Sequence, residues 1–230
     1  MEETTIAAIS TAMSASGIGI VRISGPEAFE IASGVYRSKG GKKSLKNVPS
    51  HTIHYGYIYD NEEMVDEVLV MAMRGPRTYT GEDTIEIDCH GGVLAMKKVL
   101  ETVLKNGAII AEPGEFTKRA FLNGRIDLSQ AEAVMDVVNA AAQQSLRAAV
   151  AQLNGSVSRA VGEVESLLLD ALSGIDAALD YPDEAEADAY AALPEQLKAA
   201  QERIARLLAE GRRGRVLVRA SGTEPIIRVM

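Results

Sequence analysis

Residues 111–128 read AEPGEFTKRAFLNGRIDL. Within this stretch, near residue 125, the sequence pattern changes from short β-branched runs to an alanine-rich pattern with helical spacing. Pro113 and Gly114 end one element, after which apolar residues recur at helical spacing. The short helix that they predict ends near Gly124, because glycine readily adopts the left-handed conformation that follows a helix. Arg125 then lies at a helix end, where its guanidinium is available to an anion. The alternative is a corner between two helices with solvated charges.

Before the change, short β-branched runs alternate with helical patterns and predict an α+β domain. The predicted strands are residues 5–9, 18–23, 51–59, 65–73, 84–88 and 108–111. The residues DNEE at positions 60–63 suit a hairpin turn between two of them. Helices are predicted over residues 26–35, which begin with a proline, and over residues 92–106, which end before a glycine.

Beyond the change, strand signals vanish and an alanine-rich pattern predicts an all-α helical bundle. Ser129 and Glu132 have the spacing of a capping box, and apolar residues follow at three-four spacing. This pattern predicts one long helix that ends by Gly155. Further helices are predicted up to about Leu179 and over residues 197–208.

The length and composition of the chain limit the classes of protein to which it can belong. The 230 residues, 47% of them hydrophobic, suffice for one large or two ordinary domains. Without an apolar run of membrane-spanning length or a signal-peptide pattern, a cytoplasmic protein with no membrane contact is expected. The single cysteine, Cys89, excludes an internal disulfide and is expected to be buried. A formal charge of −8 disfavours strong binding to a nucleic acid backbone by this chain alone.

Charged residues within the predicted strands are the candidates for ligand binding. Arg22 lies in an otherwise apolar run, where its burial costs free energy unless it meets an anion or a carboxylate. It is therefore either a ligand contact or half of an ion pair. Glu86 and Asp88 alternate with isoleucines and share one strand face. If that face is covered, a flat ring with adjacent N–H and NH2 groups satisfies one carboxylate bidentately, whereas on a solvent face the two acids are unremarkable.

Two other segments are candidates for metal or nucleotide sites. His90 precedes two glycines and a predicted helix whose first amides suit an anion, but no second His or Cys lies at metal-ligand spacing, so no metal is predicted. Residues 34–44 superficially resemble a phosphate-binding P-loop, yet the glycine spacing is wrong and no helix follows. The sequence therefore predicts no site that binds and hydrolyses a nucleoside triphosphate.

Three ordered motifs resemble those of the MnmE (TrmE) family of tRNA-modifying GTPases. They are GIGIVRISGP at residues 17–26, YTGED at 79–83 followed by Glu86 and HGG, and PGEFTKRAFLN at 113–123. The similarity covers residues 4–211. It implies a folate-binding and dimerisation domain over residues 1–118, with a mixed sheet, two helices and a likeness to the tetrahydrofolate domain of aminomethyltransferases. A partial helical domain over residues 119–211 is implied to follow.

The resemblance also implies a function and its residues. Family members, with the flavoprotein MnmG, install an aminomethyl-type group on the wobble uridine of certain tRNAs, and the carbon comes from 5-formyl- or 5,10-methylene-tetrahydrofolate. By motif position, Arg22, Glu86 and Arg125 match the folate contacts. A homodimer through the N-terminal domain is implied, with tRNA contacted indirectly. The family's GTPase domain is missing from this sequence, so neither GTP hydrolysis nor bound GTP, Mg or K is expected, and activity of the chain alone stays open.

Residues 212–230 resemble instead the C-terminal phosphate loop of phosphoglucosamine mutases. The residues that match the grip on a sugar phosphate are Arg219, Ser221, Gly222 and Thr223. Mutase activity is not expected, because no phosphoserine loop or Asp-x-Asp-x-Asp metal site precedes them, and a chimeric or misjoined chain is the hypothesis. Three functions therefore compete: a folate module for tRNA modification, a non-catalytic folate-binding or dimerisation scaffold, and a phosphosugar mutase fragment, in that order.

Overall fold

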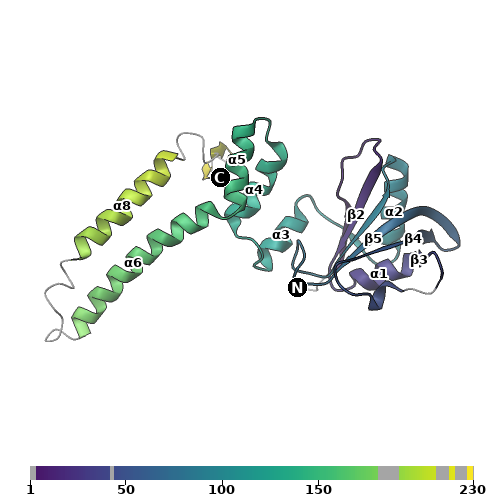
Figure 1. The fold of residues 1–230 in the computed structure, drawn as a ribbon, viewed down its shortest axis with the longest axis horizontal. Helices are drawn as coiled ribbons and strands as arrows, with labels where there is room; N and C mark the ends of the chain where they lie inside the picture. Colours follow the sequence, from purple (N-terminus) through teal and green to yellow (C-terminus); the bar gives the residue numbers. More distant parts are fainter. Residues whose placement is uncertain (1–3, 42–43, 181–191, 211–217, 221–226, 230) are drawn as a thin grey trace. The chain divides into compact units, whose positions relative to one another are not determined.

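The structure is a computed structural model that describes residues 4–41, 44–180, 192–210, 218–220 and 227–229 (Figure 1). By the contacts between its residues the chain divides into two units, Met1–Ile126 and Asp127–Met230. None of the helices in the described ranges is long and apolar enough to cross a membrane.

The first unit is a seven-stranded sheet with helices packed on it. Its elements are β1 (Ile6–Ile9), β2 (Ile18–Ser24), α1 (Ala28–Val35), β3 (Tyr36–Ser38), the 3-10 helix η1 (Leu45–Asn47), β4 (Thr52–Asp60), β5 (Glu63–Met73), β6 (Thr84–His90), α2 (Val93–Lys105), β7 (Ile109–Ile110) and α3 (Glu115–Leu122). The strand order is β3-β4-β5-β6-β2-β1-β7, and β1–β7 is parallel while the other neighbours are antiparallel. The predicted α+β domain with a mixed sheet is confirmed.

The core lies on one face of this sheet. Val21 of β2 and Ile87 of β6 are fully buried there, in one cluster with the buried side chains of α1 and α2. Cys89 is on the same side and is buried and free, as predicted. Because side chains alternate along a strand, Arg22 and Glu86 project from the opposite face. The charged side chains of β2 and β6 therefore lie on the face of the sheet that points away from the core.

The second unit is helical, as predicted. Its described elements are α4 (Leu128–Asn139), α5 (Gln143–Leu153), α6 (Ser156–Asp180), α8 (Leu193–Glu210) and the antiparallel pair β8 (Val218–Ala220) and β9 (Ile227–Val229). The helices α6 and α8 lie side by side (Figure 1). Small side chains are buried in this unit, among them Ala133, Ala149, Ala171 and Ala200, which lets helices approach closely.

The start and length of the first helix of this unit differ from the prediction. The capping box is formed by Asp127, whose carboxylate accepts from the Gln130 amide at 2.8 Å, while the Gln130 side chain accepts from the Asp127 amide at 2.9 Å. The predicted box of Ser129 and Glu132 is wrong, because Asp127 offers the same spacing two residues earlier. The predicted single helix is two helices, since α5 folds back on α4 and Gln152 donates to the Ser129 carbonyl at 3.0 Å.

The core assignment predicts how strongly single truncations destabilise the first unit. Ile87→Ala removes a fully buried side chain from a central strand, so the free energy of unfolding should fall by about 2–5 kcal/mol. The control Leu94→Ala truncates an 81% exposed residue of α2 and should change it by less than about 1 kcal/mol. Urea denaturation followed by circular dichroism measures both, and equal effects would contradict the assignment of the buried face.

Candidate functional site

The register of β2 against β6 sets Arg22 directly opposite Glu86. Both the Nε and the Nη2 atoms of Arg22 lie 2.7 Å from the Oε1 atom of Glu86. The side chains are only 24% and 14% exposed, so each charge is partly withdrawn from water and depends on the other. Of the two interpretations open for Arg22 in the sequence, the ion pair is present. Within the described residues no donor reaches Glu86 Oε2, so this oxygen is available to a further hydrogen bond.

Asp88 continues the polar row one position along the same face, as predicted for the two acids. Its Oδ1 atom is buried and has no hydrogen-bond partner in the described part of the chain. Burial and the nearby charge of Glu86 raise the pKa of Asp88 above its usual range. Asp88 also lines a cavity of about 410 Å³ that contains Ile18, Tyr55, Leu69 and His90 among its residues. The face that carries Glu86 therefore continues into a hollow with an unused acceptor.

Aromatic rings connect Arg22 to Arg125. The Arg22 Cζ atom lies 5.3 Å from the centre of the Tyr79 ring and 5.5 Å from that of Phe116. The Arg125 Cζ atom lies 5.3 Å from the same Tyr79 ring. These distances are within the range of cation–π attraction. Arg22 and Arg125 thus share the Tyr79 ring, and Glu86 joins them through its ion pair with Arg22, although the three predicted site residues come from β2, β6 and the segment after α3.

Arg125 has the position that the sequence predicted. The helix α3 ends at Leu122, Gly124 has a φ of +70°, and the Arg125 amide donates to the Ala120 carbonyl at 2.9 Å. Its guanidinium is exposed and makes no ion pair or hydrogen bond with any described residue. An uncompensated cation therefore lies beside the ring that Arg22 also contacts.

Sequence reasoning missed Tyr79 and Phe116 as members of this site. In the sequence Phe116 is one apolar position of the α3 pattern, and Tyr79 is part of a family motif without an assigned role. Aromatic residues make up 4% of the chain, and these two lie in charged, glycine-containing segments rather than in apolar runs. That contrast is the signal that could have found them.

His90 is a structural residue in this fold. Its Nδ1 atom lies 2.6 Å from Asp66 Oδ1, and its backbone amide donates to Asp66 Oδ2 at 2.8 Å. The hydrogen bond and the negative charge of Asp66 raise the pKa of His90 above its ordinary value. The pair ties the end of β6 to β5, and α2 begins three residues later at Val93.

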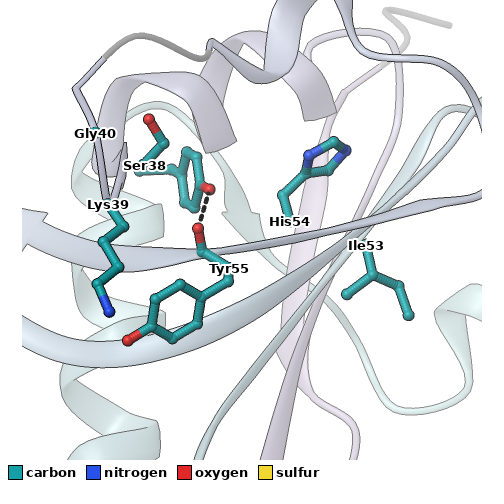
Figure 2. A pocket seen from close by; sticks show the side chains of 7 residues that line it. Ser38, Lys39, Gly40, Ile53, His54 and Tyr55 are labelled. Atoms are coloured by element: carbon teal, nitrogen blue, oxygen red, sulfur yellow. Dashed lines mark hydrogen bonds between the residues drawn. The ribbon is translucent and has the colours of Figure 1, made fainter.

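A second hollow lies beside β3 and β4 (Figure 2) and shares Tyr55 with the cavity at Asp88. It has a volume of about 360 Å³ and is lined by Tyr36, Ser38, Lys39, Gly40, Ile53, His54 and Tyr55. The Tyr36 hydroxyl donates to the Tyr55 carbonyl at 2.8 Å, and the Lys39 Nζ atom lies 5.3 Å from the Tyr55 ring. None of the predicted site residues lines this hollow, and we assign it no ligand.

The predicted phosphate site in the tail stays a prediction. Arg219 lies in β8, whereas Ser221, Gly222 and Thr223 lie outside the described residues. In the described ranges no group of three His, Cys, Asp or Glu side chains is arranged to hold a metal ion.

The contact between His90 and Asp66 predicts a pH dependence. Because the pKa of His90 is raised in the folded state, the pair stabilises the fold fully below the ordinary pKa of 6.5, and this contribution is lost as the pH rises through the folded pKa. Asp66→Asn should return the pKa of His90 towards 6.5, whereas the control Asp60→Asn should leave it raised. An NMR titration of the imidazole signals, assigned with His90→Gln, measures both, and an unchanged pKa in Asp66→Asn would refute the pairing.

Comparison with known proteins assigns the family of both units. Residues 5–125 match the family described as GTP-binding protein TrmE N-terminus, and residues 128–220 match the MnmE helical domain. The second match extends past residue 211, where the sequence predicted the family pattern to end.

Relatives named tRNA modification GTPase MnmE match most of the chain. The protein of Lachnoclostridium phytofermentans is 58% identical over 184 residues, which are 80% of this chain and 40% of the relative. That of Lysinibacillus sphaericus is 48% identical over 94% of this chain and 48% of its own length, and that of Bacillus subtilis is 48% identical over 93% and 47%. The chain thus spans about half the length of the curated relatives it matches. With two family matches in succession and this degree of identity, the chain belongs to the MnmE (TrmE) family.

Proposed function

We propose that the first unit binds a tetrahydrofolate one-carbon donor between Arg22, Glu86 and Arg125. The observation that carries the proposal is, within the described residues, a carboxylate with one unpaired oxygen, on Glu86, and a guanidinium without an acidic partner, on Arg125. The ring of Tyr79 connects Arg125 to Arg22, the partner of Glu86. One carboxylate oxygen of Glu86 binds Arg22, and the other accepts no hydrogen bond from the described residues. Arg125 has no acidic partner among the described residues. A ligand that suits this set has adjacent N–H donors, a flat ring and an anionic group.

The reduced pterin ring of a tetrahydrofolate fits the Glu86 side of this arrangement. Its amino group and the neighbouring ring N–H point along one edge, and such an edge donates to a carboxylate in a fixed plane. The rings of Tyr79 and Phe116 are half-buried beside it and supply apolar surface for a flat heterocycle. The acceptor on Asp88 and the adjoining cavity extend the same face.

Arg125 fits the other end of such a ligand. Folates end in one or more glutamate groups, whose carboxylates are anionic at neutral pH. An arginine binds a carboxylate with two parallel hydrogen bonds, and an exposed arginine is free to do so. The charge of Arg125 therefore selects a folate over an uncharged pterin.

Within the family, this site would serve tRNA modification. The relatives are named tRNA modification GTPases, and we infer that this chain holds the 5-formyl- or 5,10-methylene-tetrahydrofolate from which a carbon reaches the wobble uridine, together with the flavoprotein MnmG, in the cytoplasm. The share of the function that falls to these residues is binding and orientation of the donor.

A homodimer through the first unit is part of the same proposal. The sheet face opposite the core carries exposed apolar side chains: Ile18 is 61%, Ile53 63% and Leu69 45% exposed. Apolar side chains gathered on one face commonly mark an interface. The cavity beside Asp88 includes Ile18 and Leu69, so a second copy on this face would border the ligand.

A non-catalytic scaffold is the second candidate function. It is favoured by the exposed apolar side chains Ile18, Ile53 and Leu69, which suit an interface whether or not a folate binds. A scaffold that only dimerises differs from the folate module in one measurable property, which is affinity for a folate.

The proposal predicts the effect of removing the charge of Glu86. Glu86→Gln keeps the shape but replaces one carboxylate oxygen by a donor NH2, so the affinity for 5-formyltetrahydrofolate should fall roughly 10- to 100-fold. The control Glu101→Gln alters an exposed acid of α2 and should leave the affinity unchanged. Isothermal titration calorimetry of the full chain measures both. Binding that is equally tight in Glu86→Gln would remove Glu86 from the site, and a wild-type chain that ignores folates but dimerises would favour the scaffold.

A further inference from the structure

The helix α3 contributes Phe116 to the candidate site and leads directly into Arg125, yet it packs weakly on the rest of the first unit. Of its eight residues only Ala120 is buried. It also lacks the extensive contacts that α1 and α2 make with the strands of the described sheet. The orientation of this helix must therefore come from individual polar contacts.

One side chain of α3 makes most of those contacts. The Arg119 Nη1 atom lies 2.7 Å from the Thr4 carbonyl oxygen and 3.2 Å from Glu82 Oε1. Its Nη2 atom lies 3.0 Å from Glu115 Oε1 and 3.2 Å from Thr4 Oγ1. The side chain of Arg119 is 13% exposed, which makes it the most enclosed cation in the ion pairs of the described residues. Arg119 thus joins α3 both to the residues before β1 and to the segment between β5 and β6.

The segment between β5 and β6 that Arg119 contacts through Glu82 also contains Tyr79. The Glu82 carboxylate also accepts a hydrogen bond from Ser24, the last residue of β2, at 2.8 Å. Two further contacts link α3 to the same segment: the Tyr79 hydroxyl lies 2.8 Å from Thr117 Oγ1, and Asn123 donates to the Thr80 carbonyl at 2.8 Å.

The approach of the two segments is close. Gly81 has a φ of +80°, and a Cβ atom at this position would lie 3.3 Å from Asn123 Cβ. Three polar contacts therefore join α3 and the residue after it to the segment between β5 and β6. Of these three, only the contact of Arg119 with Glu82 is ionic.

We propose that Arg119, through Glu82, is the positioning residue that holds Phe116 and Arg125 against Tyr79 in the folate site. This inference rests on the proposed function for the identity of the ligand, whereas the orientation of α3 by Arg119 does not depend on it. Arg119 itself reaches only Thr4, Glu82 and Glu115 among the described residues, so it acts through the helix rather than on the ligand.

Only arginine suits this task. The planar guanidinium presents several N–H groups in one fork, which here meet two carboxylates and a carbonyl oxygen at once. A lysine ammonium in the same place is a point charge on a flexible stem and would not fix the direction of the helix. Because Arg119→Lys keeps the charge and loses the geometry, it is an informative variant beside Arg119→Gln.

The test is a double-mutant cycle on binding of 5-formyltetrahydrofolate to the full chain. Arg125→Gln and Arg119→Gln should each weaken binding about 10-fold, and the double variant should be weaker by clearly less than the product of about 100-fold, because Arg119 acts in part through Arg125. Arg119→Lys should lose most of the same affinity. Lys118→Gln, an exposed neighbour on α3, is the control and should bind as the wild type does. Effects that multiply to about 100-fold in the double variant would overturn the proposal.

Hydrogen exchange separates this inference from the folate proposal. In Arg119→Gln and in Glu82→Gln, the amides of residues 115–126 should exchange at least about 10-fold faster, while those of β2 and β6 stay protected. If the wild type binds no folate but α3 loosens as stated, the proposed function fails and the mechanical inference stands. If exchange in residues 115–126 is unchanged in both variants, Arg119 does not position the helix and the inference is wrong.

Discussion

The ion pair between Arg22 and Glu86 is the interaction on which the candidate site depends. Both residues project from the face of the sheet opposite the hydrophobic core, at neighbouring positions of two central strands. Each alone would leave a half-buried charge without a partner, which is strongly unfavourable. Paired, they allow a charged group to remain within a sheet whose other face packs on the apolar core. The end-on geometry, with two donors on one oxygen, also leaves the carboxylate able to bind a ligand.

The fold places this pair within reach of segments that are distant in the sequence. Tyr79 comes from the connection between β5 and β6, while Phe116 and Arg125 come from α3 and the residues after it. The contacts of Arg119 with Glu82 and of Asn123 with the Thr80 carbonyl join these two segments. The sheet thus supplies a rigid surface, and the attached helix completes the site. This division explains why the motif at residues 113–123 is rich in charges that do not follow an apolar stripe.

Local patterns in the sequence predicted the strands and their faces, but not the contacts between distant segments. A run of β-branched residues located β2, and alternation of isoleucine with acids in β6 correctly put Glu86 and Asp88 on one face. The pairing of Glu86 with Arg22 could not be predicted, because strand register depends on contacts between residues 64 positions apart. The contacts of Arg119 could not be predicted for the same reason, since its partners lie before β1 and before β6. Helix propensity also describes single segments, whereas burial of Ala133 and Ala149 as α5 packs on α4 decides where the first helix ends.

The most direct measurement is a crystal structure of the full chain with 5-formyltetrahydrofolate. Density is expected for the pterin with its amino edge within hydrogen-bond distance of Glu86, its ring beside Tyr79 and a glutamate carboxylate at Arg125. Density at another place on the chain, with the pair of Arg22 and Glu86 untouched and Arg125 still in solvent, would contradict it.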